Sequence, residues 1–498
     1  MISIGPEPAD SLPRATVTEA VFGGGGSAPE RAAKPALVAA TSGRTLSYDE
    51  LAAAVASIAT GLVRTGLGPG TVIALHLPDS PEFAVALHAA FAAGAVPFPV
   101  RATVTATELA RLLAEAGARA LVTWPVMLDI ARRAAKSADV DRVLCFGDEP
   151  DAEPFSGLTT GAAKPPETAV KPADLALLAG TRGSAGRVRC VPLTHADVSG
   201  GLFRVAEAGM IGGSDVVLSA LPLADVLGLN GVLNPALRLG ATVVTLSGAG
   251  RDNLLRAVQD QRVTMALVTP ETVEMLALDR VVPRYHLRSL RAVVAVGGPL
   301  RAEVARACAT RLGCPVRQAY GLAEAAGLTH LNLRAAEEGT LDSVGRGLLG
   351  VRWSVTDSAT GAEQPAYQAG ELCVRVLDRW VRSGDSAFAD EHGRVFILGR
   401  LGERGPEPPA EPEAVLAAHP AVREAVVAPA PDPELGLVPH AFVVLDEQIP
   451  AEVLLDYVNA HVPSYRSVPA VTVVDLIPRS PSGRVLRRAL LERAGLGS

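Results

Sequence analysis

The sequence has few of the residues that mark disulfide-rich or zinc-binding proteins. Its five cysteines are scattered among 498 residues, and none forms a C-x-x-C pair. This spacing argues against a zinc site and against a disulfide framework. Reduced thiols are typical of proteins in the cytoplasm, so we expect a cytoplasmic protein.

The sequence also lacks an excess of positive charge and any membrane segment. The net charge is −7, whereas nucleic-acid binding requires clustered Lys and Arg, so we expect no nucleic-acid partner. The N-terminus "MISIGPEPAD" is acidic and has no apolar core, so we expect no signal peptide. The longest uncharged run, Phe83–Val100, contains His88, Pro97 and Pro99. It predicts a buried helix followed by a strand, and no membrane span.

The chain is long and 48% hydrophobic, which allows a large core. Strand and helix patterns alternate from about residue 45 to residue 340, which predicts layered α/β subdomains with mainly parallel sheets. Ser47 followed by Glu50 predicts the start of one helix. Antiparallel patterns then predict a small barrel-like β subdomain. Residues 400–413 are rich in Pro, Gly and Glu and predict a linker. We therefore expect a large domain over residues 1–399 and a small α+β lid domain over residues 400–498.

A glycine-rich basic stretch, "TRGSAGRVRC" (Thr181–Cys190), follows the apolar run Leu175–Ala179. A glycine-rich turn after a buried strand directs backbone N–H groups at phosphate oxygens. The spacing G-x-x-x-x-G-K-[ST] of the common nucleotide loop is absent. Arg189 fits a phosphate contact in this loop and also fits an ordinary solvated arginine.

The same ten residues resemble the phosphate loop T-S-G-T-T-G-x-P-K-G of the adenylate-forming superfamily. This superfamily includes acyl-CoA synthetases, adenylation domains of peptide synthetases, and luciferases. Gly183, Ser184 and Gly186 match the pattern, and Arg189 stands where relatives carry the lysine. The resemblance implies an AMP-forming activation of a carboxylic acid by ATP.

Further motifs of that family occur in the same order along the chain, from about residue 45 to the end. They are "LPLADVLGLNG" (221–231), "VGGPL" (296–300), "QAYGLAEAA" (318–326), "RSGDSAFADEHGRVFILGR" (382–400) and "IPRSPSGRVLRRAL" (477–490). So many motifs in register imply that the resemblance covers both expected domains.

The resemblance implies roles for individual nucleotide-binding residues. Tyr320, beside Gly321, would stack on adenine, and the glycines Gly297 and Gly298 would end the neighbouring strand. Glu324 would hold Mg²⁺. In the "SGD" turn, Asp385 would bind both ribose hydroxyls, and Arg400 would face phosphate. Asp385 also fits a turn cap, and Glu324 a solvated residue at a helix start.

Other positions depart from the family pattern. Asp225 replaces a histidine, and with Gly228 and Ala323 it is expected near the acid substrate. Ala323 itself replaces a threonine that contacts phosphate. Asp225 fits a lining residue and a neutral drift equally well; a buried carboxylate there would favour an acid that carries an amine. Arg484 replaces the lid lysine, and its helix also fits a plain solvated basic surface.

Two functions remain open from the sequence. The first is an AMP-forming ligase that uses ATP and Mg²⁺ and passes the acyl group to coenzyme A, a carrier-protein thiol or another nucleophile. The segment between Gly399 and Pro409 is shorter than in relatives, and it lacks the glycine-rich turn that helps to seat coenzyme A. The second is a catalytically impaired protein of the same fold that binds a nucleotide or an acid as a scaffold.

Overall fold

The computed structural model describes most of the chain. The described residues are 3–4, 12–23, 29–182, 188–248, 250–333, 340–376, 379–401, 412–432, 436–462, 467–478, 490–491 and 493–496. The chain divides into two compact units, Met1–Leu401 and Gly402–Ser498. The division lies two residues beyond the expected boundary, because strand β21 (Val395–Arg400) belongs to the first unit.

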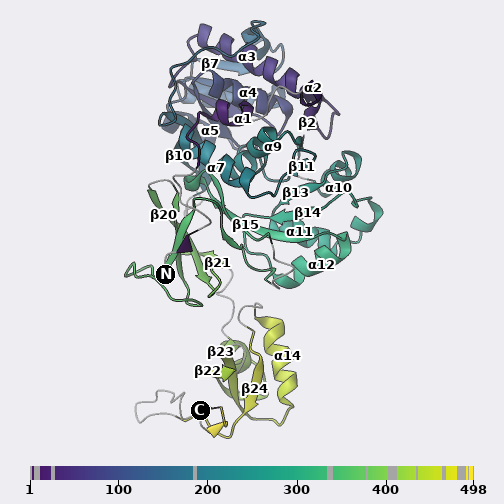
Figure 1. The fold of residues 1–498 in the computed structure, drawn as a ribbon, viewed down its shortest axis with the longest axis vertical. Helices are drawn as coiled ribbons and strands as arrows, with labels where there is room; N and C mark the ends of the chain where they lie inside the picture. Colours follow the sequence, from purple (N-terminus) through teal and green to yellow (C-terminus); the bar gives the residue numbers. More distant parts are fainter. Residues whose placement is uncertain are drawn as a thin grey trace. The chain divides into compact units, whose positions relative to one another are not determined.

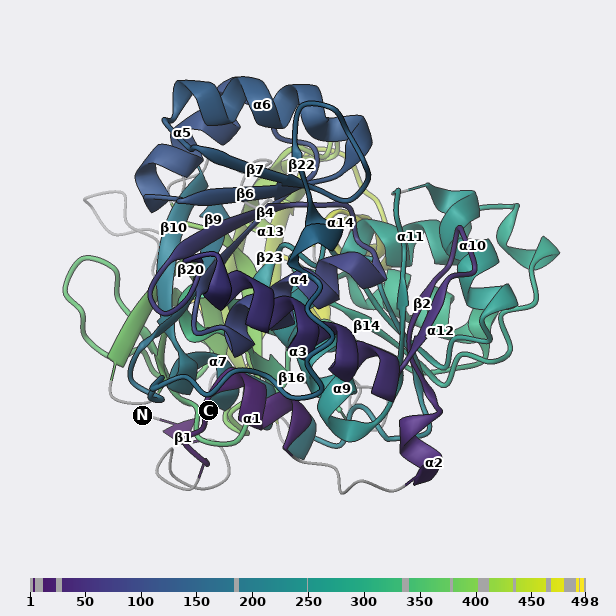
Figure 2. The ribbon, with the colours of Figure 1, turned by 90° about the horizontal axis from the view of Figure 1, so that it is seen from above.

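A five-stranded parallel sheet forms one layer of the first unit (Figure 1). Its strands, in spatial order, are β5 (Val96–Val100), β4 (Val72–His76), β6 (Ala120–Thr123), β7 (Arg142–Cys145) and β8 (Glu153–Pro154). Figure 2 shows α5 (Ala106–Ala116) and α6 (Leu128–Ser137) on one side of this sheet and α3 (Tyr48–Arg64) and α4 (Pro81–Ala92) on the other. Both faces of the sheet are therefore covered, as parallel sheets require.

A nine-stranded sheet forms the second layer. Its order is β17 (Arg346–Gly347), β16 (Gly327–Leu331), β15 (Val316–Leu322), β14 (Ala292–Ala295), β13 (Met265–Val268), β11 (Val216–Ser219), β12 (Thr242–Thr245), β2 (Pro35–Ala39) and β3 (Thr45–Ser47). The strands from β15 to β2 are parallel, and the edge strands pair antiparallel. Helices α10 (Arg251–Asp260), α11 (Pro270–Leu278) and α12 (Ala302–Leu312) pack against it with a core of their own.

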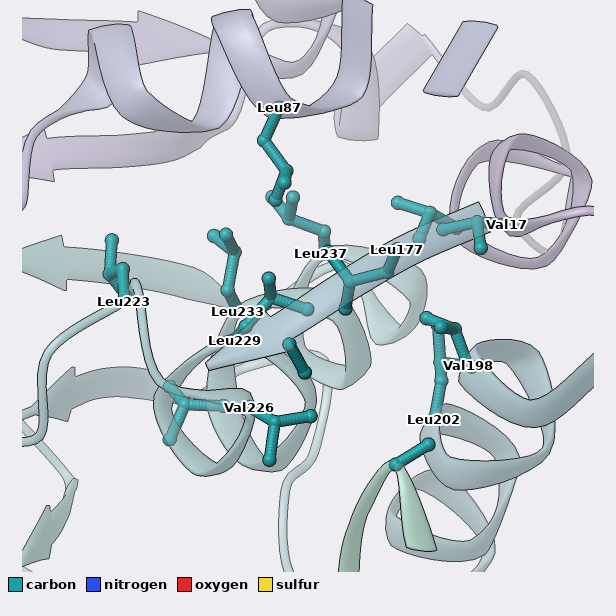
Figure 3. Close-up of a cluster of buried hydrophobic side chains, with 14 of the residues drawn as sticks. Val17, Leu87, Leu177, Val198, Leu202, Leu223, Val226, Leu229, Leu233 and Leu237 are labelled. Atoms are coloured by element: carbon teal, nitrogen blue, oxygen red, sulfur yellow. The ribbon is translucent and has the colours of Figure 1, made fainter. Parts of the chain in front are cut away.

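The largest core lies between these layers and includes short α1 (Val17–Phe22), α7 (His195–Glu207) and α9 (Asn234–Leu239). Figure 3 shows Leu87 of α4, Leu177 of β9 (Leu175–Arg182), and Leu233 and Leu237 converging in it. These side chains are fully or almost fully buried. Burial of each stabilises the fold by roughly 1.5–3 kcal/mol.

An antiparallel sheet and the second unit complete the described structure. The sheet order is β1 (Ser3–Ile4), β18 (Arg352–Thr356), β19 (Gly370–Val376), β20 (Arg379–Ala389) and β21. The second unit contains α13 (Pro412–Ala417), α14 (Ala451–His461) and a sheet of β22 (Val422–Asp432), β23 (Gly436–Leu445) and β24 (Ala470–Val473). The expected α/β fold class is confirmed. No helix among the described residues is long and apolar enough to cross a membrane.

Local sequence signals explain several of these elements. Helix α3 begins where expected, because Ser47 accepts a hydrogen bond from the Glu50 N–H while the Glu50 side chain accepts from Ser47 N–H. The uncharged run Phe83–Val100 contains most of α4 and the whole of β5, both buried, as its composition predicts.

Candidate active site

The strands that flank the glycine-rich loop form a hairpin. Strand β9 pairs antiparallel with β10 (Val188–Thr194), with Thr181 opposite Arg189. Arg189 is exposed on β10. Gly183, Ser184 and Gly186 lie outside the described residues, so their phosphate contacts remain predictions.

Tyr320, Asp385 and Arg400 lie together, although they come from three strands. The Tyr320 hydroxyl donates a hydrogen bond of 2.5 Å to Asp385 Oδ2. Arg400 Nη1 lies 3.4 Å from Asp385 Oδ1, and the two residues are opposite each other in the β20–β21 pairing. The structure thus brings together three residues that sequence motifs assigned to adenine, ribose and phosphate.

The electrostatics of this cluster follow from its burial. Tyr320 and Asp385 are 9% and 7% exposed. Burial, followed by the neighbouring Asp385 charge, holds the pKa of Tyr320 well above its usual value. The phenol therefore stays protonated and donates to Asp385. A carboxylate has about four acceptor positions, so Asp385 retains capacity for hydroxyl donors from a sugar.

Asp385 does not lie in a turn, contrary to the sequence prediction. It lies within β20, directly after Gly384, whose φ is +72°. The pairing of β20 with β19 is irregular at this point, because Glu371 pairs with Ser386 whereas Cys373 pairs with Arg382. The extra residues of this bulge, 383–385, lie in β20 and include Asp385. A bulge of this kind redirects a side chain within a strand, which gives Asp385 its orientation without a chain reversal.

Glu324 lies in the short 3₁₀ helix η6 (Ala323–Ala325), which contacts the β9–β10 hairpin. Three successive backbone carbonyls of this turn accept hydrogen bonds from side chains of other elements. Arg379 donates to Glu324 O at 2.8 Å, Arg204 to Ala325 O at 2.5 Å, and Asn230 to Ala326 O at 2.6 Å. The backbone that carries Glu324 is therefore fixed from β20, α7 and the π-helical turn η4 (Leu229–Leu233).

This turn fits the expected magnesium position. The Glu324 side chain is partly exposed and makes no ion pair among the described residues. No cluster of three or more His, Cys, Asp or Glu suited to a metal occurs in the described part of the chain. One carboxylate completed by phosphate oxygens is the usual arrangement for Mg²⁺, so the residues fit a metal that arrives with the nucleotide.

The glycines expected at the site are required to different degrees by the local backbone. Gly297 has a φ of +97°, which favours glycine, whereas a Cβ on Gly298 would make only an ordinary contact with Pro270. A Cβ on Gly321 would lie 2.5 Å from Gly327 O, and one on Gly228 would lie 2.3 Å from Pro222 O. These two glycines therefore permit a close approach of backbone to backbone, and Ala323, two residues after Gly321, is itself buried.

Asp225 has its partner within the chain. Arg101 Nε and Nη2 donate to its two carboxylate oxygens at 2.8 and 2.5 Å. Asp225 thus has no need of a ligand amine, and the argument from it for an amine-bearing substrate is wrong. Arg101 and the nearby Asp79 belong to none of the motifs in the sequence. Arg101 and Asp225 are 124 positions apart in the chain, and no motif in the sequence links them.

Comparison with known proteins now identifies the family. Residues 27–377 match the family described as AMP-binding enzyme, and residues 411–484 match the AMP-binding enzyme C-terminal domain. The chain belongs to the AMP-binding enzyme family. It is an AMP-forming, acyl-CoA synthetase-like ligase of the adenylate-forming superfamily.

Relatives match this AMP-binding enzyme over nearly its whole length. 4-Coumarate–CoA ligase of Pinus taeda is 30% identical over 93% of each chain. 4-Coumarate–CoA ligase 3 of Arabidopsis thaliana is 32% identical over 92% of this chain and 88% of the relative. Because these relatives align with both domains of the chain, they support the assignment to the superfamily that the sequence motifs predict.

Solved structures agree on the fold. The anthranilate CoA ligase AuaEII in complex with anthranoyl-AMP has a TM-score of 0.72, with 21% identity and 99% coverage of both chains. The amide bond synthetase McbA from Marinactinospora thermotolerans has a TM-score of 0.70, with 26% identity and coverage of 97% and 100%. Arg484, in the C-terminal match, lies outside the described residues.

Proposed function

We propose that this AMP-binding enzyme activates a small carboxylic acid with ATP, forming an acyl-adenylate and pyrophosphate, and then transfers the acyl group to a nucleophile. The observation that carries the proposal is the contact of Tyr320, Asp385 and Arg400. A ring, an acid and a guanidinium in one place suit adenine, ribose and phosphate. Family membership supports the same chemistry.

In the first step, a carboxylate oxygen of the acid attacks the α-phosphorus of ATP, and pyrophosphate leaves with the electrons of the broken P–O bond. Two anions must approach each other, so the site needs fixed positive charge. We assign this role to Arg189 and Arg484. Mg²⁺ held near Glu324 would neutralise phosphate charge when it is bound.

In the second step, the nucleophile attacks the acyl carbonyl carbon, and AMP leaves. Thiols and amines both qualify as the nucleophile, since the similar proteins include CoA ligases and an amide bond synthetase. Coenzyme A and a carrier-protein thiol are the first acceptors to test. The short segment between Gly399 and Pro409 makes an acceptor other than coenzyme A a real alternative.

The test is an assay with ATP, Mg²⁺ and a panel of carboxylic acids that includes 4-coumarate, benzoate and anthranilate. We expect release of AMP and pyrophosphate with at least one acid, and detection of the acyl-adenylate by mass spectrometry. Each active acid is then combined with coenzyme A to detect a thioester.

The second candidate is a protein that binds nucleotide without turnover. The replacement of both family lysines by Arg189 and Arg484 favours it, because a planar guanidinium places its charge differently from an ammonium. ATP binding measured by calorimetry, without pyrophosphate release for any acid, would support this candidate over the ligase. Absence of ATP and AMP binding would contradict both.

A further inference from the structure

A cavity of about 520 Å³ lies where parallel strands of two sheets end. Asp79 comes soon after β4, Arg101 directly follows β5, and Ser247 comes soon after β12. Ligands of α/β proteins bind outside the carboxyl ends of parallel strands, and this volume lies within the usual range for small-molecule sites. The position and size therefore suit a small ligand.

The two arginines that line this cavity are already neutralised. Arg101 forms its two-bond pair with Asp225. Arg251 donates to Asp252 and Asp279, each at 2.8 Å. Both guanidinium groups thus already have acid partners, so the lining offers no unpaired cation to an anionic group placed within it.

The two acids that line the cavity lack such partners. Among the described residues, neither Asp79 nor Glu271 forms an ion pair. Asp79 Oδ1 accepts one hydrogen bond, from the Leu223 N–H at 2.9 Å. Burial, with a further contribution from the Asp225 charge, raises the pKa of Asp79 to about 7, although the Leu223 N–H and the Arg101 charge act in the opposite direction. A cation beside Asp79 would offset this cost of burial.

The rest of the lining indicates what kind of cation fits. The lining also contains apolar side chains, such as Leu246, Leu254 and Met275, and four hydroxyl-bearing residues, Thr103, Ser219, Ser247 and Thr272. The described residues here include no group of three or more His, Cys, Asp or Glu placed to hold a bare metal ion. An organic ammonium with an apolar stem matches both the acid and the apolar walls.

We propose that this cavity is a binding site for a small molecule that carries an ammonium group on an apolar stem, with Asp79 as its ionic partner. The cavity shares Arg101, Thr103 and Ala224 with a smaller cavity of about 90 Å³. Thr181, just before the glycine-rich loop, lines that smaller cavity. The site therefore adjoins the nucleotide-binding region.

The ammonium ligand has two possible sources in the reaction, and this part of the inference rests on the proposed function. It is either an acid substrate that bears an amine or the amine that accepts the acyl group. Both sources share the chemistry that Asp79 recognises, and the experiment below separates them.

The first experiment measures binding without ATP. Benzylamine and its neutral counterpart benzyl alcohol are titrated into the full-length protein, followed by ligand-observed NMR. We expect benzylamine to bind at least tenfold more tightly than benzyl alcohol, and Asp79→Asn to remove this preference. Asp49→Asn, at an exposed position on α3, is the matched control and should leave it unchanged.

Two results would overturn the site: equal affinity of wild-type protein for both ligands, or an unchanged preference in Asp79→Asn. The wild-type comparison stands even if the variant fails to fold.

The second experiment adds ATP and Mg²⁺. Faster pyrophosphate release with 3-(aminomethyl)benzoate than with 3-methylbenzoate identifies an acid substrate, whereas an amide from benzoate and benzylamine identifies an acceptor. Retained benzylamine binding without any pyrophosphate release would count against the proposed function and leave the site standing.

Discussion

At the scale of single residues, the contact between Tyr320 and Asp385 allows ring and hydroxyl effects to be separated. Tyr320→Phe keeps the ring and removes the donor to Asp385, so we expect ATP affinity to fall less than about fivefold. Asp385→Asn removes the charge and half of the acceptor oxygens, and we expect at least a tenfold fall. Calorimetry with ATP measures both. An Asp385→Asn protein that binds ATP as well as wild type would contradict the ribose assignment.

His88 provides a second residue-scale prediction, on acid stability. It is 1% exposed, and its ring nitrogens have no hydrogen-bond partner among the described residues. Burial lowers its pKa from 6.5 to about 3. The unfolded chain therefore binds this proton between these pH values while the folded chain does not, so stability is lost as pH falls below 6.5.

His88→Leu removes this titration at similar volume. Between pH 7 and pH 5, one such group lowers the free energy of unfolding by about 2 kcal/mol, so we expect the variant to lose about that much less than wild type. Urea unfolding at the two pH values measures the difference. An exposed His286→Leu variant is the control. Equal losses in wild type and His88→Leu would show that His88 does not titrate in this range.

At the scale of elements, the Glu324 turn is held by side chains that the sequence did not reveal. Asn230 lies in η4 and donates to Ala326 O and to Val198 O, at 2.6 and 2.9 Å. Asn230→Ala leaves both buried carbonyls without this donor, which should destabilise the protein by about 1–3 kcal/mol. The turn should also lose its fixed position, so we expect weaker dependence of ATP binding on Mg²⁺.

The matched control is Asn253→Ala, at an exposed position on α10. Chemical denaturation and ATP titrations with and without Mg²⁺ measure the two effects separately. A variant that is destabilised but keeps the full Mg²⁺ dependence would assign Asn230 a structural role alone. Glu324→Gln should abolish the Mg²⁺ dependence with little change in stability, because its side chain is partly exposed.

The elements also show what a sequence can and cannot predict. Alternating patterns predicted the α/β layers because a buried strand and an amphipathic helix are local features, and the Ser47–Glu50 pair marked the start of α3 for the same reason. The structure places Asp385 beside Tyr320 and Arg400 but within a strand and not in the expected turn, since a bulge within a strand looks like a turn in sequence. The sequence does not predict the cluster of Asp79, Arg101 and Asp225. These residues lie far apart in the chain, and only the folded arrangement of β4, β5 and the segment around residue 225 brings them together.

At the scale of the whole molecule, the proposed reaction divides its charges between the two compact units. Tyr320, Asp385 and Arg400 belong to the first unit, whereas Arg484 belongs to the second. The last lysine in the chain is Lys171, so no lysine follows that could replace the family lysines at the positions of Arg189 and Arg484. Nucleotide binding should therefore depend on the first unit, and adenylation on both.

Arg484→Ala in the full-length protein tests this division. We expect ATP affinity within about threefold of wild type, because the contacts of adenine and ribose are untouched. Pyrophosphate release should fall by about 10²–10³-fold, the usual effect of removing one group that stabilises transition-state charge. Arg484→Lys then distinguishes two explanations for the arginine. Faster pyrophosphate release indicates that the arginine weakens the family's usual arrangement, whereas slower pyrophosphate release indicates that the guanidinium is adapted to this substrate. Unchanged release in Arg484→Ala would remove the second unit's arginine from the reaction.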